Sequence, residues 1–220
     1  SKEIACMQKS GAITAAAMMA AKAVIRPGVT TKQIDRAVHA AILEKGAVPS
    51  FLGYGGFPGS ACVSVNDEVI HGIPGERVIH EGDLVKIDVG ALFEGFHGDC
   101  AATFAVGEVS KEARQLMDVT RQSFYEGIKF ARVGYRVSDI SHAVQAYAES
   151  FGYGVVRQFV GHGVGRKLHE DPEVPNFGKP GHGPRLLPGM TIAVEPMINA
   201  GSFDVKVMPD NWRSEERRVG

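Results

Sequence analysis

The chain resembles itself, and this internal repeat limits its possible folds more than any other feature of the sequence. Residues 26–40 match residues 132–146, because each copy has a glycine turn followed by apolar residues at helical spacing. Residues 82–88 match residues 189–195 at nearly the same separation along the chain. Two elements that recur in the same order indicate a duplicated chain in which each half supplies two helices and then strands.

Helices followed by strands in each half favour an α+β architecture, with helices over a central antiparallel sheet. The repeat also equates Asp88 with Glu195, and each of these carboxylates ends a predicted apolar strand. If a pseudo-twofold axis relates the halves, the two carboxylates meet. The duplication therefore predicts a central site built from both halves.

Composition is that of a soluble globular protein rather than a disordered one. Of the 220 residues, 44% are hydrophobic and 22% are charged, and the net charge of −1 argues against a broad nucleic-acid or membrane footprint. No apolar stretch is long enough to cross a bilayer. The N-terminal residues keep helical spacing up to Pro27, which predicts an amphipathic helix with apolar positions at Ile4 and Met18 rather than a signal peptide. Three cysteines without a CxxC pair favour the reducing cytoplasm.

Two aspartates lie on a predicted β-hairpin. Residues 84–91 alternate between apolar and polar positions, and residues 97–106 indicate the returning strand. With the turn centred between residues 93 and 94, Asp88 and Asp99 stand directly opposite each other. Like charges so placed are destabilising, so the pair needs a shared proton or a cation, and two metal ions about 3.5–4 Å apart suit it. Two unrelated aspartates on a solvated hairpin are the alternative.

Two further stretches supply residue types that bind metals. Residues 159–172 hold two histidines in a predicted glycine-rich loop, and the glycines beside His162 leave it room to approach an ion. Residues 191–196 indicate an apolar strand that ends at Glu195, because Pro196 stops the pairing. Three carboxylates and one imidazole indicate a site for Mn, Fe, Co or Zn rather than a structural zinc site of the thiolate type. The candidate ligands are Asp88, Asp99, His162 and Glu195.

Several short motifs together resemble those of the type I methionine aminopeptidases. They occur in the order seen in that family, and the resemblance runs from about Glu3 to Trp212. The motifs are Val69–Pro74, Lys86–Val89, Gly95–Asp99, Gly161–Gly165, Leu168–Glu170 and Val194–Met197.

This resemblance implies the duplicated pita-bread fold, as one domain over residues 1–212 with pseudo-repeats at about 3–107 and 108–212. It also implies a site with two divalent metal ions. The implied activity is removal of the initiator methionine from nascent chains whose second residue is small. Nascent N termini near the ribosome are the implied partners, and we expect a cytoplasmic monomer.

The resemblance also implies a role for each candidate residue. Asp88 resembles the aspartate that chelates one ion, Asp99 the bridging aspartate, and His162 the ligand of the other ion. Glu195 resembles the glutamate that binds metal and acts as general base. His71 and His169 resemble two histidines of the family that do not bind metal and that contact the scissile peptide. The implied methionine pocket consists of Tyr54, Phe57, Cys62, His71, Leu168 and Trp212. Position 168 is often aromatic in the family, so Leu168 loosens that wall.

After Trp212 the sequence departs from the family. Residues 213–220 are mostly charged, whereas the family has two more strands and a final glutamate that bridges both metals. We therefore expect a foreign or frame-shifted tail without strand character, and a weakened or single-metal site.

Three alternatives remain open at this point. One is an X-Pro aminopeptidase or prolidase of the same fold, a class that usually carries an extra N-terminal domain. Another is a non-catalytic relative that binds peptides or proteins. The last is an inactive, truncated form of the methionine-specific enzyme.

Overall fold

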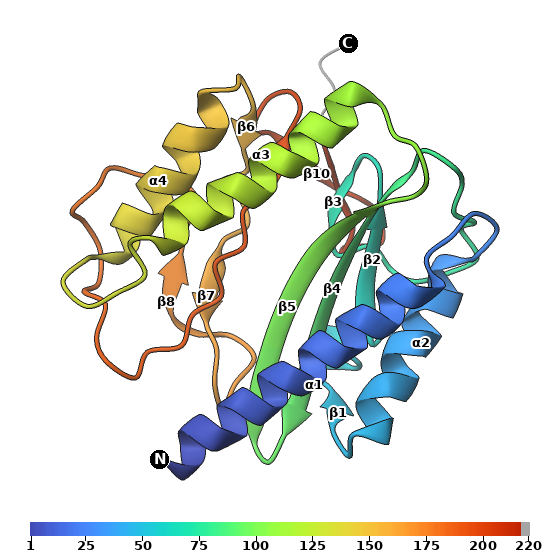
Figure 1. Ribbon diagram of the computed structural model, residues 1–220, viewed down its shortest axis with the longest axis horizontal. Helices are drawn as coiled ribbons and strands as arrows, with labels where there is room; N and C mark the ends of the chain where they lie inside the picture. The colour runs from blue at the N-terminus through green and yellow to red at the C-terminus, as the bar shows by residue number, and fades with distance from the viewer. Residues whose placement is uncertain (217–220) are drawn as a thin grey trace. The chain divides into compact units, whose positions relative to one another are not determined.

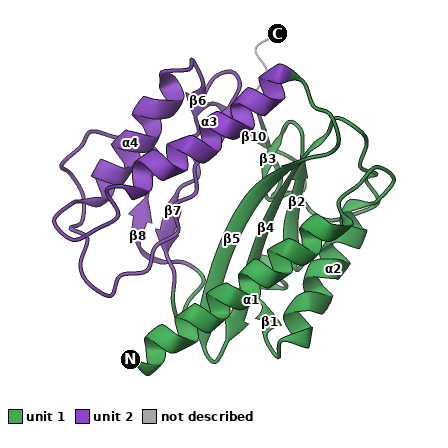
Figure 2. Ribbon diagram, in the orientation of Figure 1, with its two compact units in different colours: residues 1–110, 165–168, 207–215 green, residues 111–164, 169–206, 216–220 purple. Residues whose placement is uncertain are grey.

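In the computed structural model, residues 1–216 are described, and within them the chain divides into two units. Unit 1 consists of residues 1–110, 165–168 and 207–215 (Figure 2). Unit 2 consists of residues 111–164 and 169–206, together with Glu216. Each unit has its own helices, strands and apolar core, and each is described by itself.

Unit 1 begins with two helices, α1 (Lys2–Val24) and α2 (Thr31–Glu44). Thr30 caps α2, because its hydroxyl accepts the N–H of Gln33 and the Gln33 side chain accepts the N–H of Thr30. The predicted N-terminal helix is therefore confirmed.

The buried face of α1 agrees with the prediction at Met18, which is 5% exposed, but not at Ile4. Ile4 is 56% exposed, whereas Ser10 and Thr14 are fully buried against the sheet. The reason is Gly98 on the neighbouring strand β5 (Phe96–Ala105), where a Cβ would lie 2.5 Å from the hydroxyl oxygen of Thr14. The helix approaches the strand so closely that only small side chains fit between them.

The sheet of unit 1 is antiparallel and carries α1 and α2 on one face (Figure 1). The long strand β4 (Leu84–Phe93) pairs with β5, with β2 (Ala61–Val65) and with the short strand β1 (Val48–Pro49). As predicted, the apolar positions of β4 are buried in the core, whereas Lys86 and Asp88 belong to its other face. The polar face of β4 and β5 is thus available for a functional site.

Unit 2 repeats the order of helices before strands. Its helices α3 (Lys111–Ile128) and α4 (Val137–Glu149) pack closely at Gly127, where a Cβ would lie 2.7 Å from the Val144 side chain. Its strands pair as β6 (Gly154–Val155) with β9 (Ile198–Asn199) and as β7 (Gly161–Gly163) with β8 (Glu170–Val174). The predicted α+β architecture is confirmed, whereas the boundaries of the pseudo-repeats stay a prediction.

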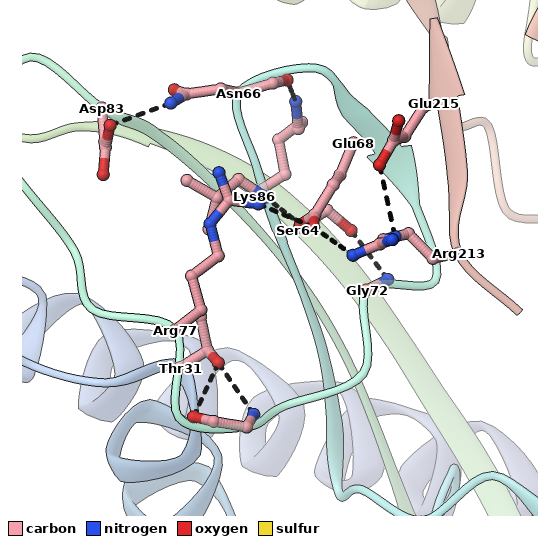
Figure 3. A network of polar contacts seen from close by, with 12 residues as sticks. Thr31, Ser64, Asn66, Glu68, Gly72, Arg77, Asp83, Lys86, Arg213 and Glu215 are labelled. Carbon is pink, nitrogen blue, oxygen red and sulfur yellow. Dashed lines mark hydrogen bonds and ion pairs between the residues drawn. The ribbon is translucent and has the colours of Figure 1, made fainter. Parts of the chain in front are cut away.

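The prediction that no strand follows Trp212 is wrong for Ser214–Glu216. These residues form β11, which pairs with β3 (Glu68–Ile70), and Ser214 is fully buried. Charged residues hide this strand in the sequence pattern, but in the structure their charges are paired. Arg213 lies 3.1 Å from the buried carboxylate of Glu68 and 3.4 Å from the carboxylate of Glu215 (Figure 3). Residues 217–220 lie outside the described part of the chain, and the origin of this segment stays a prediction.

Two short elements complete the described chain. A 3₁₀ turn, η1 (Tyr54–Gly56), precedes β2, and β10 (Val205–Val207) crosses the boundary between the units in the sequence. None of the helices within residues 1–216 combines the length and hydropathy that a membrane-spanning segment requires.

Candidate functional site

The hairpin of β4 and β5 turns one residue later than predicted. Glu94 and Gly95 have φ angles of 48° and 80°, and they form the two-residue turn. Such a turn needs positive φ at both positions, which the glycine adopts without strain and Phe93 would resist. The predicted direct opposition of Asp88 and Asp99 is therefore wrong.

The observed register makes the two aspartates diagonal neighbours on one face of the sheet. Asp99 stands opposite Gly90, and Asp88 stands opposite Ala101 on one side and Cys62 on the other. Diagonal neighbours have Cα atoms about 7–8 Å apart, within reach of two carboxylates that bind a shared cation. Asp88 and Asp99 therefore still form a pair of carboxylates on one face, and their electrostatic repulsion is weaker than in the predicted register.

Cys100 follows Asp99 but belongs to the other face of β5, where it packs against the core. Burial raises the pKa of the Cys100 thiol, and the charges of Asp88 and Asp99 raise it further. Because metal binding requires a thiolate, this cysteine is a poor competitor for a cation.

His162 lies in β7, between two glycines that have no room for a side chain. A Cβ at Gly161 would lie 2.2 Å from the carbonyl oxygen of Ala193, and one at Gly163 would lie 2.3 Å from that of Asp171. The prediction of a glycine-rich loop is therefore wrong at residues 161–163, whereas residues 164–169 do form a loop. The segment is a strand, and its glycines allow neighbouring backbone to pack tightly around His162.

The imidazole of His162 is oriented by its own strand. Its Nδ1–H donates to the carbonyl oxygen of Gly163 at 2.8 Å, because a carbonyl can only accept. Its Nε2 lies 3.2 Å from Oε1 of Glu195. A histidine whose one ring N–H is held by a backbone carbonyl presents the other nitrogen to a metal, and this is the usual arrangement of a histidine ligand.

Glu195 follows an extended segment rather than the predicted strand. The N–H of Ala193 donates to the carbonyl oxygen of His162 at 2.7 Å, and the Asn176 amide donates to the carbonyl oxygen of Glu195 at 2.9 Å. Pro196 has no N–H, so a continuous ladder cannot form here. These few bonds nevertheless fix the Glu195 backbone beside His162.

His169 lies just before β8, and its ring centroid is 4.2 Å from that of His162. Unit 2 thus brings together His162, His169 and Glu195. Asp88 and Asp99 lie in unit 1, so the predicted meeting of Asp88 with Glu195 stays a prediction.

An apolar cluster in unit 1 gathers most of the predicted methionine pocket. Trp212 packs edge-on against Phe57, with ring centroids 5.2 Å apart, and its ring centroid is 6.4 Å from that of His71. Tyr54 is 47% exposed and does not belong to the cluster. The cluster consists of Phe51, Phe57, Cys62, Leu168, Ile73 and Trp212.

Sequence reasoning missed Phe51 and Ile73. Phe51 lies shortly after β1, and a Cβ at Gly90 would lie 2.8 Å from its ring and 2.8 Å from the Ser50 side chain. A pattern could have indicated it, because Phe51 opens the same aromatic run that contains Tyr54 and Phe57. Ile73 lies two residues after His71, within one of the quoted motifs.

The donors fit a divalent cation. Unit 1 offers two carboxylates on one face of a hairpin, and unit 2 offers a carboxylate beside an oriented imidazole. Hard oxygen donors with imidazole nitrogen suit divalent ions such as Mn, Fe, Co and Zn. An α+β chain with these donors belongs among the metal-dependent enzymes in the chemistry that it can support.

Comparison with known proteins identifies the family within that class. Residues 5–214 match the model of metallopeptidase family M24, and the chain belongs to this family. The members of this family depend on divalent metal, and the chain has their pita-bread fold.

The chain is similar to curated proteins along nearly its whole length. It is 51% identical over 211 residues to a methionine aminopeptidase of Clostridium acetobutylicum, covering 96% of this chain and 84% of that protein. It is 50% identical to methionine aminopeptidase 1 of Bacillus subtilis, covering 96% and 85%.

Solved structures extend the comparison. The methionine aminopeptidase of Thermotoga maritima matches with a TM-score of 0.95 at 44% identity, over 97% of this chain and 86% of that one. The prolidase of Pyrococcus furiosus matches with a TM-score of 0.74 at 24% identity, over 89% and 56%. The second likeness shows a shared fold alone.

Proposed function

We propose that this protein is a methionine aminopeptidase, which removes the N-terminal methionine from polypeptides whose second residue is small. The observation that carries the proposal is the oriented pair of His162 and Glu195, in a chain about half identical to enzymes of that name. The alternative of an X-Pro peptidase has weaker support, because the likeness to the Pyrococcus prolidase is at 24% identity and covers 56% of that chain.

Four side chains are proposed as ligands of two divalent ions, drawn from Mn, Fe, Co and Zn. They are Asp88, Asp99, His162 and Glu195. Bound divalent ions supply the Lewis acidity that activates water for attack on a peptide carbonyl at neutral pH.

The chain's own residues complete the chemistry. Glu195 accepts a proton from the attacking water, since a carboxylate beside the reacting centre can act as general base. His169 donates a hydrogen bond to the oxygen that gains negative charge, and one such donor is worth about 10²–10³ in turnover. His71 forms a hydrogen bond at the scissile amide. The proximity of His169 to His162 supports this division of roles.

The apolar cluster of unit 1 is proposed to receive the methionine side chain. Phe51, Phe57 and Leu168 are between 3% and 9% exposed, so the cluster offers a dry, aromatic-rich wall. Burying a methionine side chain is worth about 1.5–3 kcal/mol, and thioether sulfur packs favourably against aromatic rings. Trp212 and Cys62 supply further polarizable contacts.

Nascent N termini are the proposed substrates, which the enzyme meets near the ribosome, in the cytoplasm and as a monomer. The modest net charge of −1 supports an encounter directed by the peptide rather than by a broad nucleic-acid surface.

The test combines metal titration with two peptides, Met-Ala-Ser and Ala-Pro. We expect metal-dependent cleavage of the first and not of the second. His162→Ala should lose bound metal and activity together, whereas His169→Ala should keep its metal and turn over about 10²–10³ more slowly. His80→Ala is the matched control, because that side chain is 75% exposed and lies outside the proposed site.

Full activity in His162→Ala would reject the assignment of the metal ligands. Cleavage of Ala-Pro with no cleavage of Met-Ala-Ser would instead favour the X-Pro class. Bound peptide without turnover at any metal concentration would favour a peptide-binding relative.

A further inference from the structure

His71 has a backbone conformation that is uncommon for residues other than glycine. Its φ is +59°, in the left-handed region that only a few per cent of residues other than glycine occupy, although histidine enters it more often than most. Such a conformation persists only where surrounding contacts hold it in place. The contacts of the next residue, Gly72, show what holds it.

Gly72 is bound to strand β2 through both of its backbone groups. Its N–H donates to the hydroxyl oxygen of Ser64 at 2.9 Å (Figure 3). Its carbonyl oxygen accepts the N–H of Val63 at 2.9 Å. A Cβ at Gly72 would lie 2.3 Å from the carbonyl oxygen of Val63. The backbone after His71 is therefore pressed directly onto β2.

A second anchor holds the same segment farther along. The Thr31 hydroxyl at the start of α2 accepts the N–H of Gly75 at 2.8 Å and donates to the carbonyl oxygen of Gly75 at 3.0 Å. This anchor is four residues from His71, whereas the Ser64 hydroxyl binds the peptide that immediately follows His71. Ser64 is thus a hydrogen-bond partner placed to control the His71 backbone.

Ser64 has no evident purpose as a packing residue. It is 2% exposed, and in β2 it occupies the same face as Cys62, which stands opposite Asp88. A hydroxyl buried at such a position is costly unless it forms a hydrogen bond, and the bond it forms is to Gly72.

We propose that Ser64 is a positioning residue for His71, which fixes the left-handed backbone and thereby the direction of the imidazole toward the scissile amide. The inference rests on the proposed function, in which His71 binds the substrate peptide. Ser64 itself touches neither metal nor substrate in this proposal. Its effect on the reaction passes entirely through His71.

The kinetic test is a double-mutant cycle in the full chain, with manganese and Met-Ala-Ser as the probes. Ser64→Ala should lower kcat/KM about five- to tenfold, the loss expected for one buried hydrogen bond. In the His71→Ala background the same change should have no further effect, because nothing remains to be positioned. Ser64→Thr keeps the hydroxyl and should restore most of the activity. Equal losses in both backgrounds would overturn the proposal.

A spectroscopic readout separates this proposal from the proposed function. In NMR spectra of the metal-loaded enzyme, the imidazole signals of His71 should shift in Ser64→Ala, whereas those of exposed His80 should not. Unchanged His71 signals would overturn the positioning role whatever the activity. Shifted signals in a protein that does not cleave Met-Ala-Ser would reject the function and support the positioning role.

Two further variants guard against a simple loss of folding. Ser64→Cys keeps the volume and weakens the bond, so it should shift the His71 signals in the same direction as Ser64→Ala. Ser10→Ala is the matched control, since Ser10 is a fully buried serine that donates to a backbone carbonyl, that of Ala91, at 2.7 Å. It should leave both the kinetics and the His71 signals unchanged, and a loss equal to that of Ser64→Ala would count against a specific role for Ser64.

Discussion

Replacing Asp35 should loosen the point where β2 begins. Oδ1 of Asp35, on α2, accepts the N–H of Ser60 at 2.7 Å and the N–H of Ala61 at 2.9 Å. A hydrogen bond to a charged group contributes about 1.5–3 kcal/mol, and Asp35 is partly exposed, so water replaces part of the loss. We therefore expect Asp35→Ala to lower the free energy of unfolding by about 3 kcal/mol.

For a chain of this length, that loss should lower the melting temperature by about 6–12 °C. Thermal unfolding followed by circular dichroism measures it, and urea unfolding gives the free energy directly. Asp35→Asn keeps the oxygen acceptor without the charge and should lose about half as much. Arg36→Ala changes the next, exposed residue of α2 and should stay within about 0.5 kcal/mol of wild type. If Asp35→Ala unfolds at the same temperature as Arg36→Ala, the two backbone bonds do not hold β2 and the reasoning fails.

The remaining predictions concern helix α1 and its contacts. Gly11→Ala, at an exposed helical position with open space for a Cβ, should stabilise the protein by about 0.5–1 kcal/mol. Gly98→Ala should destabilise it by about 1–3 kcal/mol, because the new methyl group would clash with α1. Urea unfolding measures both free energies, and equal effects of the two substitutions would contradict the packing argument. Burial, and after it the hydrogen bond to Glu94, raise the pKa of the Cys6 thiol in the folded protein. The contribution of this thiol to stability should therefore be complete below about pH 8.5, the ordinary thiol pKa, and should decline as the pH rises through the raised pKa of the folded state. Cys6→Ser should remove the part of the alkaline decline that Cys6 causes and leave the part due to Cys100, whose pKa is also raised, in unfolding curves measured between pH 7 and about 10. An identical decline in both proteins would refute it.

The architecture could be predicted because the repeat, the alternation of β4 and the helical spacing are local patterns with one structural meaning each. The details that failed depend on contacts that a pattern does not contain. Met18 of the predicted apolar stripe is buried, but Ile4 is not, because the close approach at Gly98 turns the side of α1 that carries Ser10 and Thr14 to the sheet. The glycines around His162 suggest a loop, yet the carbonyl of Ala193 explains them as room for backbone.

The candidate site shows the same division. Residue types and their order along the chain were enough to select Asp88, Asp99, His162 and Glu195, because few residues bind divalent ions. Their geometry could not be predicted in the same way, because the position of the two-residue turn between β4 and β5 depends on which residues tolerate positive φ. Likewise, the sequence shows no sign that a charged stretch after Trp212 buries Ser214 beside β3.

The close fit at Gly90 has a consequence for altering the range of side chains that the enzyme accepts. Gly90 faces Asp99 across the hairpin and leaves no space for a methyl group beside Phe51. Trimming Phe51 to enlarge the proposed methionine pocket relieves only one of the two clashes at position 90, because a Cβ there would still lie 2.8 Å from the Ser50 side chain. A larger residue at position 90 therefore requires changes at both Phe51 and Ser50, so libraries that vary these positions separately would miss the viable combinations.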